Sequence, residues 1–353
     1  MTSDSRRWSD HPLVQLTLVR YREFFREPEA VFWVFIFPVL LTAGLGIAFR
    51  NQPAEHTPIA VVGNAAADSG LIGSLRSSPG LTVETLPESA ATEALRIGRV
   101  ALVVVPTGRG RVEYRYDAER PEGRTARLLA DEAVQRAAGR SDPVRVRDRE
   151  TSEPGARYVD FVVPGLLGMN LMGSGIWGLG FAIVDARRKR LLKRLIATPM
   201  SRPQYLASFV LSRLSLLTIE VAVLLGFAVL AFGVPVRGSL GILAAICILS
   251  ALSFGALGLL IASRARTVEG VSGLMNLVML PMWIFSGVFF SSSRFPDAIQ
   301  PVVQALPLTA VIDALRASML QGATGGELLP ELGVIVVWLV VSFGLALRLF
   351  RWR

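Results

Sequence analysis

The sequence predicts an α-helical polytopic membrane protein with six transmembrane helices and an α/β extracytoplasmic domain. Three observations lead to this class. Hydrophobic residues make up 52% of the 353 residues, and a mean hydropathy of +0.48 is too apolar for a soluble domain. Six segments each have the roughly 20 mostly apolar residues that a bilayer-crossing helix needs. The long stretch between the first two segments instead alternates strand and helix patterns.

The six predicted spans divide the chain into its parts. They cover residues 31–49, 159–184, 208–232, 239–262, 271–290 and 331–350. The first span follows a polar, Arg-containing stretch and has no convincing small-residue cleavage site, so we expect it to be retained rather than removed as a signal peptide. The predicted parts are a cytoplasmic interfacial segment (1–30), the first span, an external domain (50–158) and a five-span part (159–353).

The segment before the first span has an amphipathic pattern. In HPLVQLTLVRYREFFREPE, residues 11–29, Leu13, Leu16 and Phe24 recur at roughly helical spacing, with Arg and Glu on the other side. The pattern predicts a helix that lies in the cytoplasmic membrane interface. The alternative is a simple basic anchor for the first span.

Loop charges predict the orientation, because loops rich in Lys and Arg stay cytoplasmic. With an inside N-terminus, the cytoplasmic segments 1–30, 185–207, 263–270 and 348–353 carry five, seven, two and three basic residues. The outside loops 233–238 and 291–330 carry one and two. Both termini are therefore expected in the cytoplasm, and the formal net charge of +9 belongs mainly to that face rather than to a nucleic-acid site.

Residues 58–139 show the pattern of a small α/β domain. Strand-like runs such as IAVV, LTVETL and VALVVVP alternate with helical stretches, and Val112, Tyr114 and Tyr116 share one face of a further strand. The domain has no Cys and no His beyond His56, which argues against a metal site or a catalytic dyad based on these residues. Its scattered charges are typical of a solvated surface. The single Cys247 lies in the fourth span, so no disulfide is expected.

Residues 291–330 are interrupted by Pro296, Pro301 and Pro307, yet they are too apolar for a free loop. Such a sequence is typical of short re-entrant helices packed against protein. Within it, Asp313 and Arg316 are three residues apart and can pair on one helical face.

A dense basic block lies between the second and third spans, with six Lys or Arg among the eight residues 187–194. As a helix it would have an apolar stripe made by Leu191, Leu192, Leu195 and Ile196, and a cationic remainder. Thr198 and Pro199 would end it. One interpretation is a topology signal attracted to anionic lipid. The other, which a short helix held between two spans favours, is a surface that receives a push from a soluble partner.

Several separated stretches together resemble the type-two ATP-binding-cassette (ABC) exporter permeases with a large external domain. YREFFREPEAVFWVFIFPVL resembles the family's interfacial helix and first span, YVDFVVPGLLGMN its second span, and LLKRLIATPMSR its coupling helix. MWIFSGVFFSSSRFPDAIQPVVQALPLTAVIDALRASMLQG resembles its fifth span and re-entrant helices. The order and spacing of these stretches cover nearly the whole chain.

The resemblance implies that residues 186–199 form a coupling helix that docks on a partner ATPase. The implied docking residues are Arg187, Arg188, Lys189, Arg190, Leu191, Lys193, Arg194, Leu195, Thr198 and Pro199, with Tyr21, Arg22 and Arg26 of the interfacial helix. Many family members have acidic residues and a Gly-Thr pair before the Thr-Pro, where this chain is basic. We therefore expect its ATPase to present an acidic groove.

The chain itself is not expected to hydrolyse ATP. Its only two lysines, Lys189 and Lys193, do not end a phosphate-binding loop of the form G-x-x-x-x-G-K-[ST]. We expect no cofactor or metal in this chain, and ATP and Mg²⁺ in a separate ABC ATPase subunit. Six spans are half of the family's usual set, which implies a homodimer or a pair with a sister permease.

Polar residues within the spans mark candidate functional positions, because ionisable groups there are costly. Glu220 has two interpretations, an interhelical hydrogen bond or a polar point on the substrate path. Arg213, nearly on the same face, is expected to reach towards the cytoplasm. Asn170 and Asn276 are weaker substrate-path candidates. An external gate is expected near residues 281–316, with Pro281, Asp313 and Arg316.

The sequence therefore predicts the permease subunit of an ATP-driven exporter that moves an amphipathic or hydrophobic substrate such as a drug, an antibiotic or a lipid-like molecule. The alternatives are a mechanical transmitter that does not transport, and a receptor that uses the external domain as a binding module. The expected location is a bacterial inner (cytoplasmic) membrane, since 35 Arg against two Lys is typical of a GC-rich bacterial genome.

Overall fold

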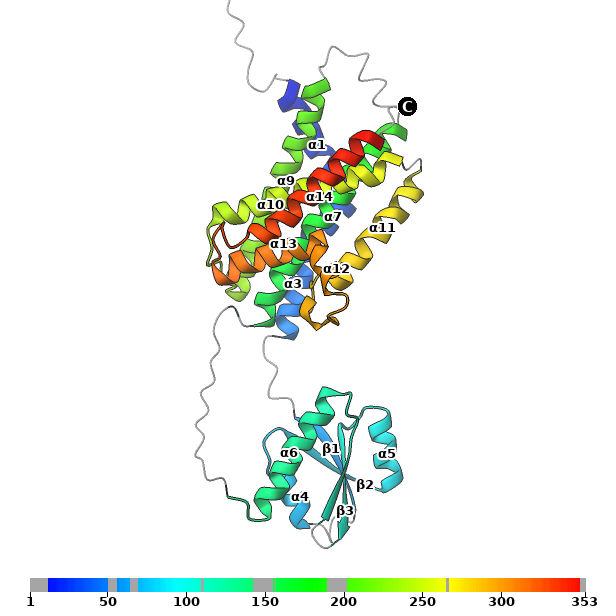
Figure 1. Cartoon of the computed structure of the whole chain (residues 1–353), viewed down its shortest axis with the longest axis vertical. Helices are drawn as coiled ribbons and strands as arrows, with labels where there is room; N and C mark the ends of the chain where they lie inside the picture. Colours follow the sequence, from blue (N-terminus) through cyan, green and yellow to red (C-terminus); the bar gives the residue numbers. More distant parts are fainter. Residues whose placement is uncertain are drawn as a thin grey trace, which may run out of the picture. The chain divides into compact units, whose positions relative to one another are not determined.

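The computed structural model describes residues 12–49, 56–63, 69–108, 111–141, 155, 157–188, 202–264 and 267–349. The chain forms two compact units. One comprises Met1–Arg50 with Ser152–Arg353, and the other comprises Asn51–Thr151. The first is helical and the second is an α/β unit (Figure 1).

The helical unit contains the six spans. Its elements are α1 (Pro12–Arg26), α2 (Pro28–Val31), η2 (Phe32–Ile36), α3 (Phe37–Ala48), α7 (Tyr158–Arg188), α9 (Arg202–Phe232), α10 (Leu240–Arg264), α11 (Val268–Phe285), η3 (Ser292–Arg294), α12 (Gln300–Ala305), α13 (Pro307–Arg316), η4 (Ala317–Gln321) and α14 (Leu329–Leu349). Helices long and apolar enough to cross a membrane cover Pro28–Ala48, Tyr158–Phe181, Leu211–Phe232, Leu240–Ser263, Val268–Phe285 and Leu329–Leu349. The predicted fold class is confirmed, with boundaries shifted by a few residues.

Helix α7 is the centre of this unit. About 83% of its span is buried, against 17% for the first and last spans. Its Val162, Leu166 and Ile176 have no exposed surface and pack with residues of α10, α11 and α13. Glycines permit close approach, because a side chain at Gly175 would lie 2.7 Å from the Cβ of Phe254 in α10. The first, third, fourth and fifth spans contact α7, whereas α14 packs against α10 and α13.

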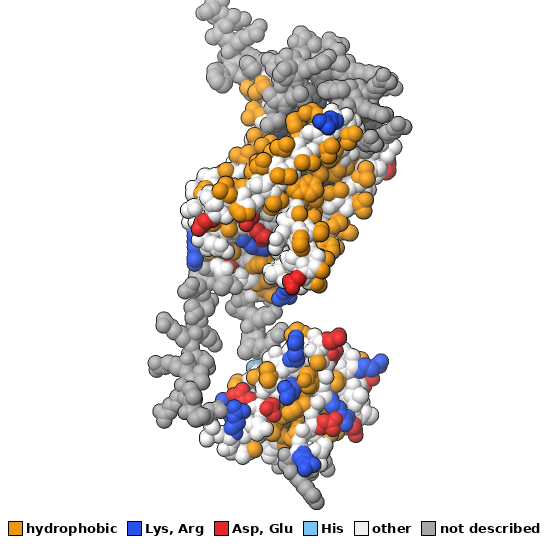
Figure 2. All heavy atoms as spheres, viewed as in Figure 1, with side chains coloured by type: hydrophobic (Ala, Val, Ile, Leu, Met, Phe, Trp, Pro, Cys, Tyr) orange, Lys and Arg blue, Asp and Glu red, His pale blue; other side chains and the backbone are white. Residues whose placement is uncertain are grey.

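The outward face of the helical unit is apolar. Large hydrophobic side chains such as Leu230, Leu277 and Val340 are between 63% and 89% exposed. Figure 2 shows hydrophobic side chains across the visible face of this unit, and a mixture of charged and hydrophobic side chains on the α/β unit. Exposed apolar patches of this extent are expected where lipid or another membrane protein covers the surface.

The segment before the last span consists of short helices, as its prolines predict. Every residue of α13 except Asp313 and Arg316 is buried, and the indole Nε1 of Trp338 in α14 donates to the carbonyl of Ala305 at 2.8 Å. These contacts attach the segment to the helical unit. Its re-entry into the membrane stays a prediction.

The α/β unit is a four-stranded sheet with helices on both faces. Its elements are β1 (Thr57–Val62), α4 (Ser69–Arg76), β2 (Leu81–Leu86), α5 (Glu88–Arg96), β3 (Leu102–Gly108), β4 (Arg111–Arg115) and α6 (Pro121–Ala137). The strand order is β2-β1-β3-β4, with β4 antiparallel to β3 and the other pairs parallel. Helices α4 and α6 cover one face, where Val112, Tyr114 and Tyr116 pack as predicted, and α5 covers the other.

Candidate functional site

Most of the basic block lies outside the described residues. Of the predicted docking residues, this applies to Lys189, Arg190, Leu191, Lys193, Arg194, Leu195, Thr198 and Pro199. The backbone of Arg187 and Arg188 forms the last residues of α7, and α9 begins at Arg202. The structure thus describes the two long helices that the block connects, and the docking role of the block stays a prediction.

Helix α1 lies along α9, at the end of the helical unit where α9 begins (Figure 1). The Tyr21 hydroxyl donates a hydrogen bond to Oγ of Ser215 in α9. Arg22 and Arg26 are exposed. The amphipathic helix predicted within residues 11–29 is present, and Tyr21 attaches it to the helix that follows the basic block.

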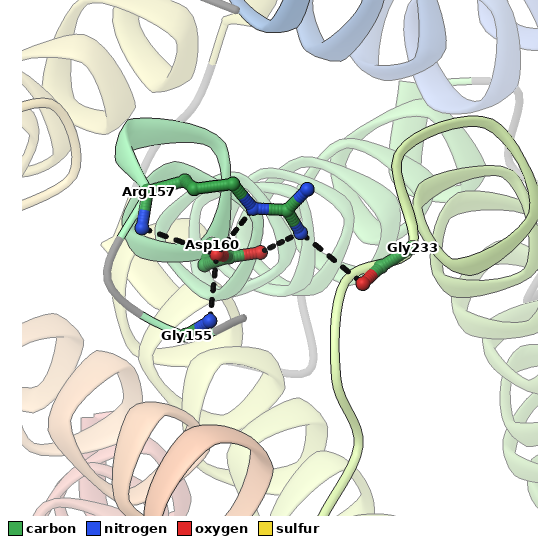
Figure 3. A network of polar contacts seen from close by, with 4 residues as sticks. All are labelled: Gly155, Arg157, Asp160 and Gly233. Carbon is green, nitrogen blue, oxygen red and sulfur yellow. Dashed lines mark hydrogen bonds and ion pairs between the residues drawn. The ribbon is translucent and has the colours of Figure 1, made fainter. Parts of the chain in front are cut away.

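At the opposite end of the helical unit, the start of α7 is held by a buried carboxylate (Figure 3). Asp160 has no exposed surface and accepts from the backbone N–H groups of Gly155 (2.8 Å) and Arg157 (3.2 Å). It also accepts from Nε and Nη2 of Arg157, at 2.9 and 2.8 Å. The bond to Asp160 raises the pKa of Arg157, so the guanidinium stays charged. A carboxylate in the first turn also interacts favourably with the helix dipole.

The same guanidinium connects α7 to α9. Nη2 of Arg157 donates to the carbonyl of Gly233 at 3.1 Å, directly after the end of α9 (Figure 3). Gly233 has a φ of +62°, which a side chain would disfavour. The Arg157 guanidinium, which pairs with Asp160 and donates to the Gly233 carbonyl, therefore holds the beginning of α7 next to the end of α9.

Arg316 connects the short helix α13 to the beginning of α7 and to the chain after α11. Its Nε and Nη2 donate to the carbonyl of Phe161 at 3.3 Å each, and Nη2 donates to the carbonyl of Gly287, just after α11. Cζ of Arg316 lies 3.7 Å from the centre of the Phe161 ring, a cation–π contact. The predicted pair with Asp313 is present at 3.8 Å. We call Arg157, Asp160, Phe161, Asp313 and Arg316 the polar knot.

The third gate candidate, Pro281, is exposed on α11 and does not join the polar knot. The chain that follows α11 does join it, through the carbonyl of Gly287. Sequence reasoning missed Asp160 and Arg157. An acidic residue in the first turn of a predicted span, three residues after an Arg, was the available signal.

Asn170 contacts the first span. Its Nδ2 donates to the carbonyl of Val34 at 3.2 Å, within the π-helical turn η2. Pro38 has no N–H to donate to the carbonyl four residues earlier, which is that of Val34. Asn170 therefore compensates for a proline in the neighbouring helix, and its substrate-path role stays a prediction.

Glu220 belongs to α9, is 2% exposed and faces α7. Its Oε2 accepts from Oγ of Ser174 at 3.0 Å, and its Oε1 lies 3.8 Å from Nη1 of Arg213. Arg213, expected to reach towards the cytoplasm, instead faces Glu220. The substrate-path role of Glu220 stays a prediction.

Asn276 lies on the exposed face of α11, eight residues beyond the start of that helix at Val268, which is about 12 Å at 1.5 Å per residue. It forms no hydrogen bond to any residue that the structure describes. A primary amide within a span needs a partner, because hydrocarbon cannot hydrogen-bond to it.

Six apolar spans, one of them largely buried among the others, with short helices before the last span, define a multi-pass membrane protein. Residues 29–348 match the family model described as ABC-2 family transporter protein, and the chain belongs to this family. Members of this family are membrane components without an ATPase domain.

Curated relatives are similar over about half of the chain. The inner membrane transport permease YadH of Escherichia coli (strain K12) is 26% identical over 190 residues, 54% of this chain and 73% of YadH. Nodulation protein J of Bradyrhizobium diazoefficiens is 29% identical over 211 residues, 56% of this chain and 76% of that protein. The linearmycin resistance permease protein LnrN of Bacillus subtilis (strain 168) is 23% identical over 202 residues, 57% of this chain and 51% of LnrN.

Proposed function

We propose that this chain is the permease subunit of an ATP-driven exporter in a bacterial inner membrane. The match of residues 29–348 to the ABC-2 family carries the proposal. Energy comes from a separate ABC ATPase that uses ATP and Mg²⁺ and docks on the basic block, with Tyr21, Arg22 and Arg26 alongside. The name of the Escherichia coli relative supports the location.

The proposed substrate is an amphipathic or hydrophobic molecule of the drug, antibiotic or lipid class. One relative is named for linearmycin resistance, which supports this class. The extensive apolar face of the helical unit offers such a molecule a surface next to the bilayer (Figure 2). The alternatives remain a mechanical transmitter and a receptor that uses the α/β unit as a binding module.

The gate of the exporter lies at the polar knot. Arg316 holds α13 to the beginning of α7 and to the end of α11, so movement of α7 changes all these contacts together. Docking of ATP-loaded subunits moves the basic block, and α7 and α9 carry the movement to the knot. Asn170 of α7 and Glu220 of α9 lie on this route.

A second permease copy or a sister permease covers α11. The unpartnered amide of Asn276, with Gly273 one turn earlier on the same exposed face, supports this arrangement. A polar side chain next to a small residue is typical of interfaces between membrane helices. In such a dimer Asn276 faces either the partner or a polar path between the two copies.

Purification of the tagged chain from its native membrane tests this function. We expect an ABC ATPase with a phosphate-binding loop to co-purify and the complex to hydrolyse ATP. The control is the same preparation from cells that carry the untagged chain. A purified chain without an ATPase, in mild detergent and in lipid nanodiscs, would favour the receptor alternative.

The proposed orientation predicts which side of the membrane each exposed residue faces. In a Cys247→Ala background, single cysteines at Ser89 in α5 and at Ala298 should react with an impermeant maleimide in intact cells. A cysteine at Glu269, in the first turn of α11 at its predicted cytoplasmic end, should react only after the cells are opened. All three positions are exposed, so burial does not limit the reaction. Reaction at Glu269 in intact cells contradicts the orientation.

A further inference from the structure

Two hydrogen bonds among the described residues join α7 and α9, the helices that the basic block connects. At one end Arg157 joins the start of α7 to the carbonyl after α9. Nearer to the basic block, Ser174 of α7 contacts Glu220 of α9. Within α9, Glu220 also lies near Arg213, and both belong to the candidate span Leu211–Phe232, where buried charges are costly.

The ion pair is incompletely bonded. Nη1 of Arg213 and Oε1 of Glu220 are 3.8 Å apart, beyond hydrogen-bonding distance. Nε and Nη2 of Arg213 and Oε1 of Glu220 are buried and have no hydrogen-bond partner among the described residues. Among the described residues, the Ser174 hydroxyl is thus the one hydrogen-bond partner of the pair. Each unbonded group carries a desolvation cost that a closer arrangement of the two side chains would reduce.

A glycine in α7 gives the guanidinium its space. A Cβ built at Gly178 would lie 3.1 Å from Nη1 of Arg213 and 3.3 Å from its Cζ. Gly178 is one turn from Ser174, so both face the same part of α9. The guanidinium therefore lies close to α7 at a position without a side chain.

Helix α9 has a second polar attachment close by. Ser215, between Arg213 and Glu220 in sequence, accepts from Tyr21 of α1. Residues 213–220 of α9 therefore have polar contacts to both α1 and α7. Such contacts exchange partners with a small displacement, whereas close-packed apolar contacts resist it.

We propose that Arg213 and Glu220 form a two-position switch between α7 and α9. In the position that the structure describes, Arg213 and Glu220 are not hydrogen-bonded to each other, and the Ser174 hydroxyl of α7 donates to the Glu220 carboxylate. In the second position the Arg213 guanidinium bonds directly to the Glu220 carboxylate within α9 and Ser174 is released, so that α9 moves along α7 together with the Arg157 attachment at the far end. This inference rests on the proposed function, because docking at the basic block supplies the displacement.

Charge exchange tests the switch. The variants are Arg213→Gln, Glu220→Gln and the double variant Arg213→Glu with Glu220→Arg, each with a reporter cysteine at Ala298 in the Cys247→Ala background. The reporter measures how much ATP with vanadate changes the maleimide reaction rate near the polar knot. We expect each single variant to keep its bound ATPase and to reduce this change about fivefold or more, and the exchange to restore it to within about twofold.

Gly178→Ala provides an independent test that removes no charge. The new methyl group would press on the guanidinium at 3.1 Å, and we expect a reduced response of the reporter. The matched control is Gly173→Ala, on the same helix, where the nearest atom to the new methyl group is 3.9 Å away. The control should respond as the unmodified chain does.

Two results would overturn the switch. One is a normal reporter response in both single variants. The other is an exchange variant that responds no better than the single variants, which would mean that Glu220 acts independently of Arg213. If the single variants do not insert into the membrane, the reporter responses of the exchange variant and of Gly178→Ala decide whether the switch exists. Failure of the proposed function is a different result, namely no ATPase bound to the unmodified chain.

Discussion

Reversal of Arg188, Arg190 and Arg194 to Glu should separate the chain from its ATPase while leaving it inserted in the membrane. Four of the seven basic residues of segment 185–207 remain, and the other cytoplasmic segments are unchanged, so the orientation should survive. Negative side chains placed against the expected acidic groove of the ATPase cost several kcal/mol, and each 1.4 kcal/mol corresponds to a tenfold change in affinity. We therefore expect at least about a hundredfold weaker docking.

The measurement is the amount of ATPase that co-purifies with the tagged chain. Labelling of a cysteine at Ser89 in intact cells serves as the control for insertion. A second variant, Leu191→Ser with Leu195→Ser, removes the predicted apolar stripe without changing charge. If the triple reversal inserts and retains its ATPase at the normal level, the basic block is a topology signal only.

Removal of Arg316 should destabilise the helical unit far more than removal of its ion-pair partner Asp313. Arg316→Met leaves the carbonyls of Phe161 and Gly287 without this donor and abolishes the cation–π contact. Each buried acceptor without a partner costs about 1–3 kcal/mol, and the ring contact adds about 0.5–2. We expect a loss of roughly 3 kcal/mol or more, measured as unfolding of the purified chain in mild detergent.

Two matched variants make the result specific. Asp313→Asn removes an ion pair of 3.8 Å whose carboxylate is 43% exposed, so it should cost less than about 1 kcal/mol. Arg294→Met removes an exposed guanidinium from the same loop region and should have a similarly small effect. Equal losses in all three variants would show that Arg316 has no special role in joining α13 to α7 and α11.

Local patterns in the sequence predicted the elements of the fold. Apolar runs of span length and alternating strands are properties of neighbouring residues, and both predictions are confirmed. The Asp313–Arg316 pair followed from helical spacing alone. A π-helical turn, Phe32–Ile36, directly precedes α3, where Pro38 is one of the first residues.

The candidate site depended on contacts between distant residues, which one sequence does not reveal. The carbonyls that Arg316 binds belong to positions 155 and 29 residues away, and backbone carbonyls leave no trace in side-chain identity. Arg213 was expected to extend towards water because long basic side chains near a span end commonly do. Its contact with Glu220 arises because Gly178 of another helix leaves room for the guanidinium.

The most direct test of the central claim is whether ATP, bound by a separate subunit at the basic block, changes the polar knot at the other end of the spans. The chain with a cysteine at Ala298, reconstituted with its ATPase in liposomes, is reacted with an impermeant maleimide with and without ATP and vanadate. The account predicts a severalfold change in rate that the triple reversal of Arg188, Arg190 and Arg194 abolishes. An ATPase that is bound and active, with the same reaction rate under both conditions, would contradict it.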